Sequence, residues 1–300
     1  MTTNQLYFWM VLSMLFWGAS WPIAHVLSSY ITEHEFIVYR YVLTVITLLP
    51  VLLWMRLSLK IDRYNFLIAS ISALLLIFYT KFYFLSTQYA TPGLAGAVVT
   101  TLMPILVYLL MLFSQQKQPS LKDWFALILG AVGVITTMDL WHLNSEQIWV
   151  DYNIYLIAAA SFWAFMSITI AQAKTLHPAV LSFYIYLMAI VFDVVFFFEP
   201  ISASILTMDG LFWSNFIIVS IGSTTFATTM YFVGLQRLGS RQASVFTFLV
   251  PFFAIGLSVI FLQEVWQWIS IFGALMTIVA LMILNQVNFS KYLAKFIKIR

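Results

Sequence analysis

The chain has 300 residues, of which 63% are hydrophobic and 8% charged, and its formal net charge is +3. A soluble domain has about 25% charged residues, so this composition excludes a water-soluble protein and indicates a polytopic membrane protein. The basic residues are spread along the chain and form no nucleic-acid-binding face. The absence of cysteine excludes disulfides and thiolate metal sites.

Ten segments are long and apolar enough to cross a bilayer, because a spanning helix needs about 20 mostly apolar residues. We therefore predict an all-α membrane protein with ten transmembrane helices. In chain order the segments are 6–27, 35–55, 64–88, 92–113, 121–138, 153–173, 178–198, 211–236, 241–262 and 266–287.

The basic residues predict the orientation of these spans. If the N-terminus is cytoplasmic, the inner loops and the tail hold 12 of the 14 basic residues and the outer loops hold none. This bias predicts that both termini face the cytoplasm and that the chain lies in the cytoplasmic (inner) membrane. The tail 288–300 is interpreted as a basic anchor or as a short amphipathic helix on the anionic inner leaflet. The inner basic residues are Arg56, Lys60, Arg63, Lys117, Lys122, Lys174, Arg237, Arg241, Lys291, Lys295, Lys298 and Arg300.

Short segments of the first half recur in the second half, in the same order and displaced by 143 to 148 residues. These pairs predict two five-helix repeats, 1–138 and 153–287, joined by an extracytoplasmic linker at 139–152. Because five is odd, the repeats would cross the membrane in opposite senses, as in secondary transporters. The pairs are FWGA (16–19) with FWAF (162–165), YFLSTQ (83–88) with YFVGLQ (231–236), TTLMP (100–104) with TFLVP (247–251), and ILGA (128–131) with IFGA (271–274).

The whole chain resembles the ten-helix EamA-type transporters of the drug/metabolite transporter superfamily. The resemblance rests on FWGASWPIAH in the first span, on Arg40, on the segments YFLSTQYA and YFVGLQRLG, and on Pro104 and Pro251. It implies a central cavity lined by spans one to four and six to nine, with spans five and ten outside. It also implies small metabolites as substrates, often amino acids or their relatives, and frequently export.

Two tryptophans lie halfway along their spans, away from the interface where tryptophan is usually enriched. Trp17 is in the first span and Trp163 is its repeat partner in the sixth. One interpretation places both rings on the cavity, where they offer π faces to a planar or cationic substrate. The other interpretation makes them bulky packing residues between the halves.

Three prolines within the predicted spans, Pro22, Pro104 and Pro251, each free the carbonyl four residues earlier. For Pro22 that residue is Gly18, in the first span. A freed carbonyl in hydrocarbon needs a polar partner, so these breaks are candidate hinges or substrate contacts. The alternative is a kink without function.

Three ionisable residues, Arg40, Lys81 and Asp193, lie inside spans, five to seven residues from the outer end. At 1.5 Å per residue this is roughly 7–10 Å deep, so ion pairing across the bundle is possible. Intramembrane charges are candidate functional groups, although Arg40 and Lys81 could also snorkel to the surface. Asp193 is a candidate contact for substrate or for a coupling proton. The two cations opposite one carboxylate would suit a zwitterion. The histidines lie near span ends, which argues against a proton relay at mid-depth; they are His25, His34, His142 and His177.

The eighth span carries hydroxyl groups at helical spacing, which predicts one polar stripe or a surface that lets helices pack closely. In the third span Tyr79 and Tyr83 share a face, and Tyr83 is the repeat partner of Tyr231. The hydroxyl residues of the eighth span are Ser220, Thr224, Thr228 and Tyr231.

The leading prediction is a secondary transporter that moves an amino acid or related zwitterion by alternating access, with export favoured over import. A larger adenine-containing metabolite such as S-adenosylmethionine is the alternative substrate. An intramembrane enzyme is disfavoured, because no histidine and only one carboxylate, that of Asp193, lie at depth. No nucleotide-binding loop, cofactor or metal site is expected. The expected partners are the bilayer and a small-molecule substrate, with a proton as one candidate coupling ion and the oligomeric state open.

Overall fold

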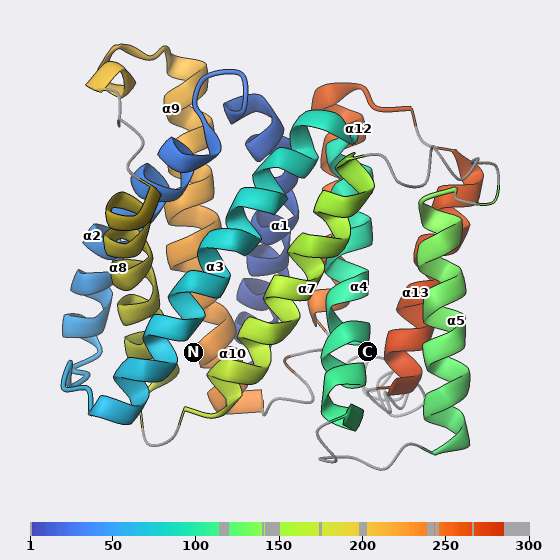
Figure 1. Ribbon diagram of the computed structural model, residues 1–300, viewed down its shortest axis with the longest axis horizontal. Coiled ribbons are helices and arrows are strands. Elements are labelled where there is room, and N and C mark those ends of the chain that lie inside the picture. The colour runs from blue at the N-terminus through green and yellow to red at the C-terminus, as the bar shows by residue number, and fades with distance from the viewer. Residues whose placement is uncertain are drawn as a thin grey trace.

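The computed structural model describes residues 2–113, 120–139, 141, 151–173, 176–197, 203–238, 243, 246–265 and 267–284. Within these ranges every regular element is a helix (Figure 1), as the sequence predicts. The linker 139–152 and the tail 288–300 fall almost wholly outside the described residues.

Helical structure is described within each predicted span. The first half contains α1 (Thr3–Leu27), α2 (Glu33–Trp54), α3 (Arg63–Tyr89), α4 (Pro92–Phe113) and α5 (Leu121–Thr137). The second half contains α7 (Asp151–Ala171), α8 (Pro178–Phe197), the short 3-10 helix η2 (Ala203–Thr207), α9 (Gly210–Ile217), η3 (Ile218–Ala227), α10 (Thr228–Leu238), the 3-10 turn η4 (Thr247–Leu249), α12 (Val250–Leu262) and α13 (Trp268–Leu284).

Among the described residues, seven helical segments are long and apolar enough to cross a membrane, which makes this a multi-pass membrane protein. They are α1 to α4, α7, α8 and the continuous segment Gly210–Gly234. Two further apolar helices, Thr247–Leu262 and Trp268–Leu284, are shorter.

Polar side chains in the turns define where several helices begin. The hydroxyl oxygens of Thr2, Thr32 and Ser120 accept the backbone N–H three residues later in capping boxes. Asp62 and Asp209 cap α3 and α9 in the same way. The capping N–H groups, those of Asn65 and Phe212, lower the pKa of these two carboxyls below its usual range. The sequence therefore starts these helices locally, whatever they pack against.

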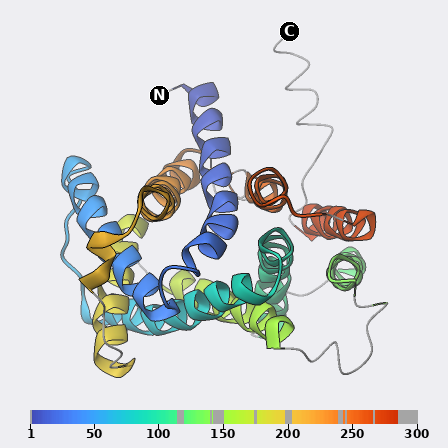
Figure 2. The same ribbon diagram turned by 90° about the horizontal axis from the view of Figure 1, so that it is seen from above.

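Eight helical segments form a closed ring, which is visible from above in Figure 2. The principal contacts run from α1 to η3, then to α2, α8, α3, α7, α4 and α12, and from α12 back to α1. Consecutive members of the ring alternate between the two halves of the chain. The pair α5 and α13 packs mainly on itself outside the ring, as the family resemblance implies.

Exchanging the two halves leaves this contact pattern unchanged. The exchange turns the contact of α1 with η3 into that of α7 with α3, and the contact of α1 with α12 into that of α7 with α4. The contacts of α2 with α8, α4 with α12 and α5 with α13 map onto themselves. The packing is thus that expected of two homologous halves related by a pseudo-two-fold axis.

The η3 segment is a difference from the prediction of a regular α-helix over 211–236. Residues Ile218–Ala227 form a π-helix of 10 residues, in which backbone hydrogen bonds span five residues instead of four. Two threonines reinforce this register, because the hydroxyls of Thr224 and Thr225 donate to the carbonyls of Val219 and Ser220, five residues earlier. The wider turn rotates the following residues relative to an α-helix.

Helices α5 and α13 approach closely because glycines lie at their contact. A Cβ built on Gly133 would lie 2.3 Å from the Thr277 hydroxyl oxygen and 2.8 Å from the Thr277 backbone nitrogen. On the opposite helix, a Cβ on Gly273 would lie 2.3 Å from the Thr137 nitrogen. Small residues are the usual means of close helix packing in membranes.

We expect Gly133→Ala to lower the free energy of unfolding by about 1 to 3 kcal/mol, because its methyl group would force backbone apart. Thermal unfolding of the detergent-solubilised protein would measure the loss. Gly256→Ala in α12 is the matched control, since no atom lies within 4 Å of its added Cβ. Equal melting temperatures for the two variants would contradict the packing described for α5 and α13.

Candidate functional site

The helical ring encloses a cavity of about 640 Å³, a size typical of small-molecule sites. All eight ring segments contribute to its wall, and α13 adds two leucines. The lining residues are Trp17, Ser20, Trp21, Arg40, Tyr41, Leu76, Tyr79, Thr100, Met103, Pro104, Val107, Tyr108, Met111, Trp163, Ser167, Tyr186, Ser223, Thr224, Thr228, Tyr231, Thr247, Val250, Leu281 and Leu284.

Arg40 is the one charged residue among the described residues that line the cavity, and no carboxylate accompanies it there. Its Nε donates to the Thr224 hydroxyl oxygen at 3.0 Å, which joins α2 to η3. Its guanidinium carbon lies 5.2 Å from the centre of the Phe36 ring. Because the surrounding protein has a low dielectric constant, this cation attracts an anionic group strongly.

Two aromatic pairs flank the cavity, one beside each predicted tryptophan. The Trp17 ring lies 5.1 Å from the Tyr231 ring, and its Nε1 donates to the Ser223 carbonyl at 3.0 Å. The Trp163 ring lies 4.8 Å from the Tyr79 ring. In each pair, the tryptophan from the first helix of one half meets a tyrosine of the third spanning segment of the other half. The four residues all line the cavity.

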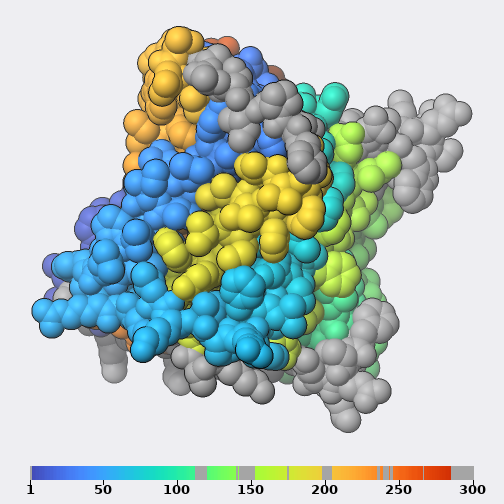
Figure 3. All heavy atoms as spheres, turned by 60° about the vertical axis from the view of Figure 1, so that its left-hand side comes forward, coloured from blue at the N-terminus to red at the C-terminus, as the bar shows by residue number. Residues whose placement is uncertain are grey.

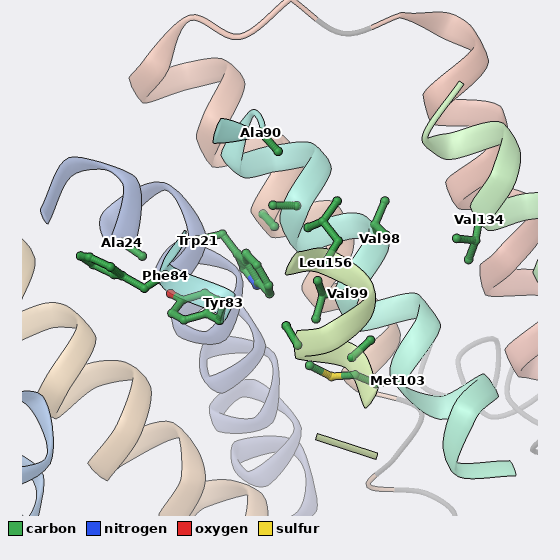
Figure 4. Close-up of a cluster of buried hydrophobic side chains, with 14 of the residues drawn as sticks. Trp21, Ala24, Tyr83, Phe84, Ala90, Val98, Val99, Met103, Val134 and Leu156 are labelled. Carbon is green, nitrogen blue, oxygen red and sulfur yellow. The ribbon is translucent and has the colours of Figure 1, made fainter. Parts of the chain in front are cut away.

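Tyr83 lies one layer behind the cavity wall. It is buried, its hydroxyl donates to the Ser20 carbonyl, and its ring meets the Trp21 ring edge-on at 4.6 Å. Figure 4 shows Tyr83 beside Trp21 within the apolar cluster that also contains Phe84. Tyr83 therefore positions Ser20 and Trp21, which do line the cavity.

The hydroxyl stripe of the eighth span is shifted by the π-helix. Thr224, Thr228 and Tyr231 line the cavity, but Ser220 does not, and Ser223 takes its place. Ser220 is buried, and its carbonyl accepts the Thr44 hydroxyl of α2 at 3.4 Å. Ser220 thus lies at the contact with α2, as the close-packing alternative expects, because the π-helical turn changes the face on which successive residues lie.

The predicted helix breaks fall into different environments. Pro104 lies inside α4 and on the cavity wall, while Pro22 lies inside α1 and is buried behind it. Pro251 is in the first turn of α12, directly after the 3-10 turn η4, so it lies where the segment Thr247–Leu262 changes from 3-10 to α-helical structure. Gly18 packs against α12, where an added Cβ would lie 2.5 Å from the Phe253 Cβ.

The three predicted intramembrane charges are not gathered at the cavity. Lys81 forms an ion pair with Glu33 at 3.3 Å, and its Nζ lies 5.7 Å from the Phe197 ring. Asp193 lies with its Oδ2 2.5 Å from Nδ1 of His34, and both side chains are buried. Of the three, Arg40 alone reaches the cavity. The partners of the other two, His34 and Glu33, lie in the first turn of α2.

Sequence reasoning also missed Tyr41 and Tyr186, which face each other across the cavity wall. Their rings lie 5.1 Å apart, on α2 and α8, and both line the cavity. Their position along the spans could have identified them, because each tyrosine lies within a span, whereas tyrosine is usually enriched at the membrane interface.

The residues that the structure describes contain no group of three or more histidine and acidic side chains able to hold a metal ion. The wall of the cavity is instead built from one guanidinium, several hydroxyls, aromatic rings and aliphatic side chains. Such a wall has the groups needed to bind and orient an organic molecule.

Residues 5–138 and 152–286 each match the model of the EamA-like transporter family. The two matches cover both halves of the chain, so the resemblance drawn from the sequence is confirmed. A protein of known crystal structure shares the fold, with a TM-score of 0.66 and 15% sequence identity over 95% of this chain and 99% of its own. No curated protein matches the chain.

We expect Trp17→Phe to reduce the free energy of unfolding by about 1 kcal/mol, because the ring is kept while the Ser223 carbonyl loses its donor. Thermal unfolding in detergent would measure this. Trp9→Phe is the matched control, since Trp9 is 36% exposed on the outer face of α1. A larger loss in the Trp9 variant than in the Trp17 variant would contradict the assigned hydrogen bond.

Proposed function

The chain belongs to the EamA-like transporter family, and we propose that it is a secondary transporter of a small metabolite that carries a carboxylate group. The observation that carries this proposal is the cavity between the two halves, in which Arg40 is unaccompanied by any carboxylate among the described lining residues. A guanidinium binds a carboxylate through two parallel hydrogen bonds, which orients the ligand as well as holding it.

An amino acid is the substrate that this wall favours. Its carboxylate would bind Arg40, and its ammonium group would face the rings of Trp17, Trp163 and their tyrosine partners through cation–π interactions. This assignment replaces the expected contact of the ammonium group with Asp193, which is engaged by His34. An aromatic or aliphatic side chain would fill the apolar remainder of the cavity.

A larger adenine-containing metabolite such as S-adenosylmethionine is the second candidate. The observation in its favour is the number of aromatic rings around the cavity, on which a purine could stack while its carboxylate bound Arg40. The two candidates share the carboxylate and differ in the planar base.

The proposed mechanism is alternating access between two halves of opposite orientation. Its support is the ring in which the halves alternate, because exchanging their conformations would convert a state open on one side into its counterpart open on the other. The basic residues of the loops support cytoplasmic termini and insertion in the inner membrane. Export is favoured over import by analogy with the family.

We expect reconstituted proteoliposomes to transport radiolabelled amino acids from a panel that also contains S-adenosylmethionine. Arg40→Gln should lower the transport rate about tenfold or more, because it removes the charge that holds the carboxylate. Arg63→Gln, which removes an exposed arginine at the start of α3, is the matched control and should leave transport unchanged. Transport of S-adenosylmethionine alone, without competition by amino acids, would contradict the amino acid assignment.

The proposed topology can be measured by labelling, because the native chain has no cysteine. In single-cysteine variants, Lys60→Cys and Arg237→Cys should react with a membrane-impermeant maleimide from the same face of the membrane. Ser29→Cys, in the turn between α1 and α2, should react from the other face. Labelling of positions 60 and 237 from opposite faces would exclude the antiparallel relation of the two halves.

A further inference from the structure

Helices α2 and α8 meet along an antiparallel seam that runs the length of the ring. At one level Tyr41 packs on Tyr186, with ring centres 5.1 Å apart. His34 lies seven residues before Tyr41 in α2 and contacts Asp193, which lies seven residues after Tyr186 in α8. Seven residues are two helical turns, or about 10.5 Å, so the same face of each helix carries both contacts. In Figure 3, α8 lies between α2 and α3.

The two ends of this seam have opposite chemistry. Leu48 lies seven residues after Tyr41 in α2. It belongs to an apolar cluster with Ala179, Val180 and Phe183 of α8. The middle of the seam, at Tyr41, forms part of the cavity wall. At the end near the α1–α2 turn, the His34 imidazole contacts the Asp193 carboxylate, and these side chains are only 3% and 2% exposed. One end of the seam is thus closed by apolar packing and the other by a pair that can bind protons.

The other charged groups near the pair have partners of their own or lie away from it. On α3, Lys81 is engaged by Glu33 of α2. Glu35 forms the capping box of α2 with Thr32. Arg40 lies one to two helical turns from His34 and faces the cavity. The η3 segment has no charged residue, and Asp209 at the start of α9 accepts the Tyr30 hydroxyl and the N–H of its own helix. The sole charged residue in the described part of α10 is Arg237, in its last turn.

We propose that the His34–Asp193 pair is a proton-binding site that closes one end of the transport pathway and opens it when a further proton binds. With the imidazole protonated and the carboxylate ionised, their attraction holds α2 to α8 in a buried environment. A proton taken from solution forms an O–H bond at Asp193 and removes the negative charge. The buried imidazolium then lacks its counter-ion, which is strongly unfavourable, so this end of the seam separates and water enters.

The site is placed to couple proton binding to substrate binding. Arg40 lies six residues from His34 on α2, and Tyr186 lies seven residues from Asp193 on α8. Both cavity residues therefore move with the helices that the pair holds together. This inference rests on the proposed function, whose topology places the α1–α2 turn outside, where an incoming proton would arrive.

The test measures the opening of the seam directly and needs no substrate. Nitroxide labels at Ser29→Cys and Val195→Cys, both exposed near this end, would report its width by pulsed electron paramagnetic resonance in nanodiscs. A second pair, Leu53→Cys and Pro178→Cys, reports the apolar end. On acidification from about pH 7 to about pH 3, across the range where a carboxylate beside a cation binds its proton, the first distance should lengthen and the second should not.

In the first labelled background, Asp193→Asn should abolish the pH-dependent change, because the amide cannot bind the proton. His34→Gln should do the same, and it keeps the test decisive if the Asp193 variant fails to fold. Glu33→Gln is the matched control: it breaks the neighbouring pair with Lys81 and should retain the change. The inference is overturned if the unsubstituted seam does not respond to pH, or if the response survives both Asp193→Asn and His34→Gln.

The result separates this inference from the proposed function. A seam that opens with pH in a protein that transports no amino acid leaves the proton site standing and overturns the substrate assignment. Transport of amino acids by a protein whose seam does not respond to pH overturns the proton site alone.

Discussion

The structure depends on one constraint: neither half of the chain can bury its own polar face. Lipid offers no hydrogen-bond partners, so the hydroxyls, the Arg40 guanidinium and the carboxylate of Asp193 must face protein or an enclosed cavity. The principal contacts around the ring all join a helix of one half to a helix of the other. The polar residues of both halves are thereby turned inward together. A cavity between the halves is the direct result of this alternation.

This arrangement explains why the contacts that shape the cavity cross between the halves. Trp17 of the first half donates to the Ser223 carbonyl of the second, and Arg40 donates to Thr224. On the opposite wall, Trp163 of the second half packs on Tyr79 of the first. A relative movement of the halves would change all these contacts at once. Binding of a ligand to these side chains and the conformation of the bundle are therefore linked physically.

Charges in the membrane part of the protein follow two patterns. Lys81 forms an ion pair with Glu33, and Asp193 contacts His34, both close to one end of the bundle. Arg40 contacts neutral groups, the Thr224 hydroxyl, the Phe36 ring and the Tyr83 hydroxyl. An excess cation beside a cavity is costly unless something anionic binds there, and this asymmetry is the strongest pointer to the chemistry of the substrate.

The sequence by itself determined the helices and the two homologous halves, because hydropathy, capping residues and repeat spacing act locally along the chain. Only the tertiary structure decided which polar groups meet. The partner of Asp193 depends on the rotation of α8 against α2, and the face presented by Ser220 depends on the π-helical turn that precedes Thr228. Likewise, the 3-10 turn η4 directly before Pro251 is visible only in the structure. Contacts between helices depend on their rotation and distance, which hydropathy does not encode.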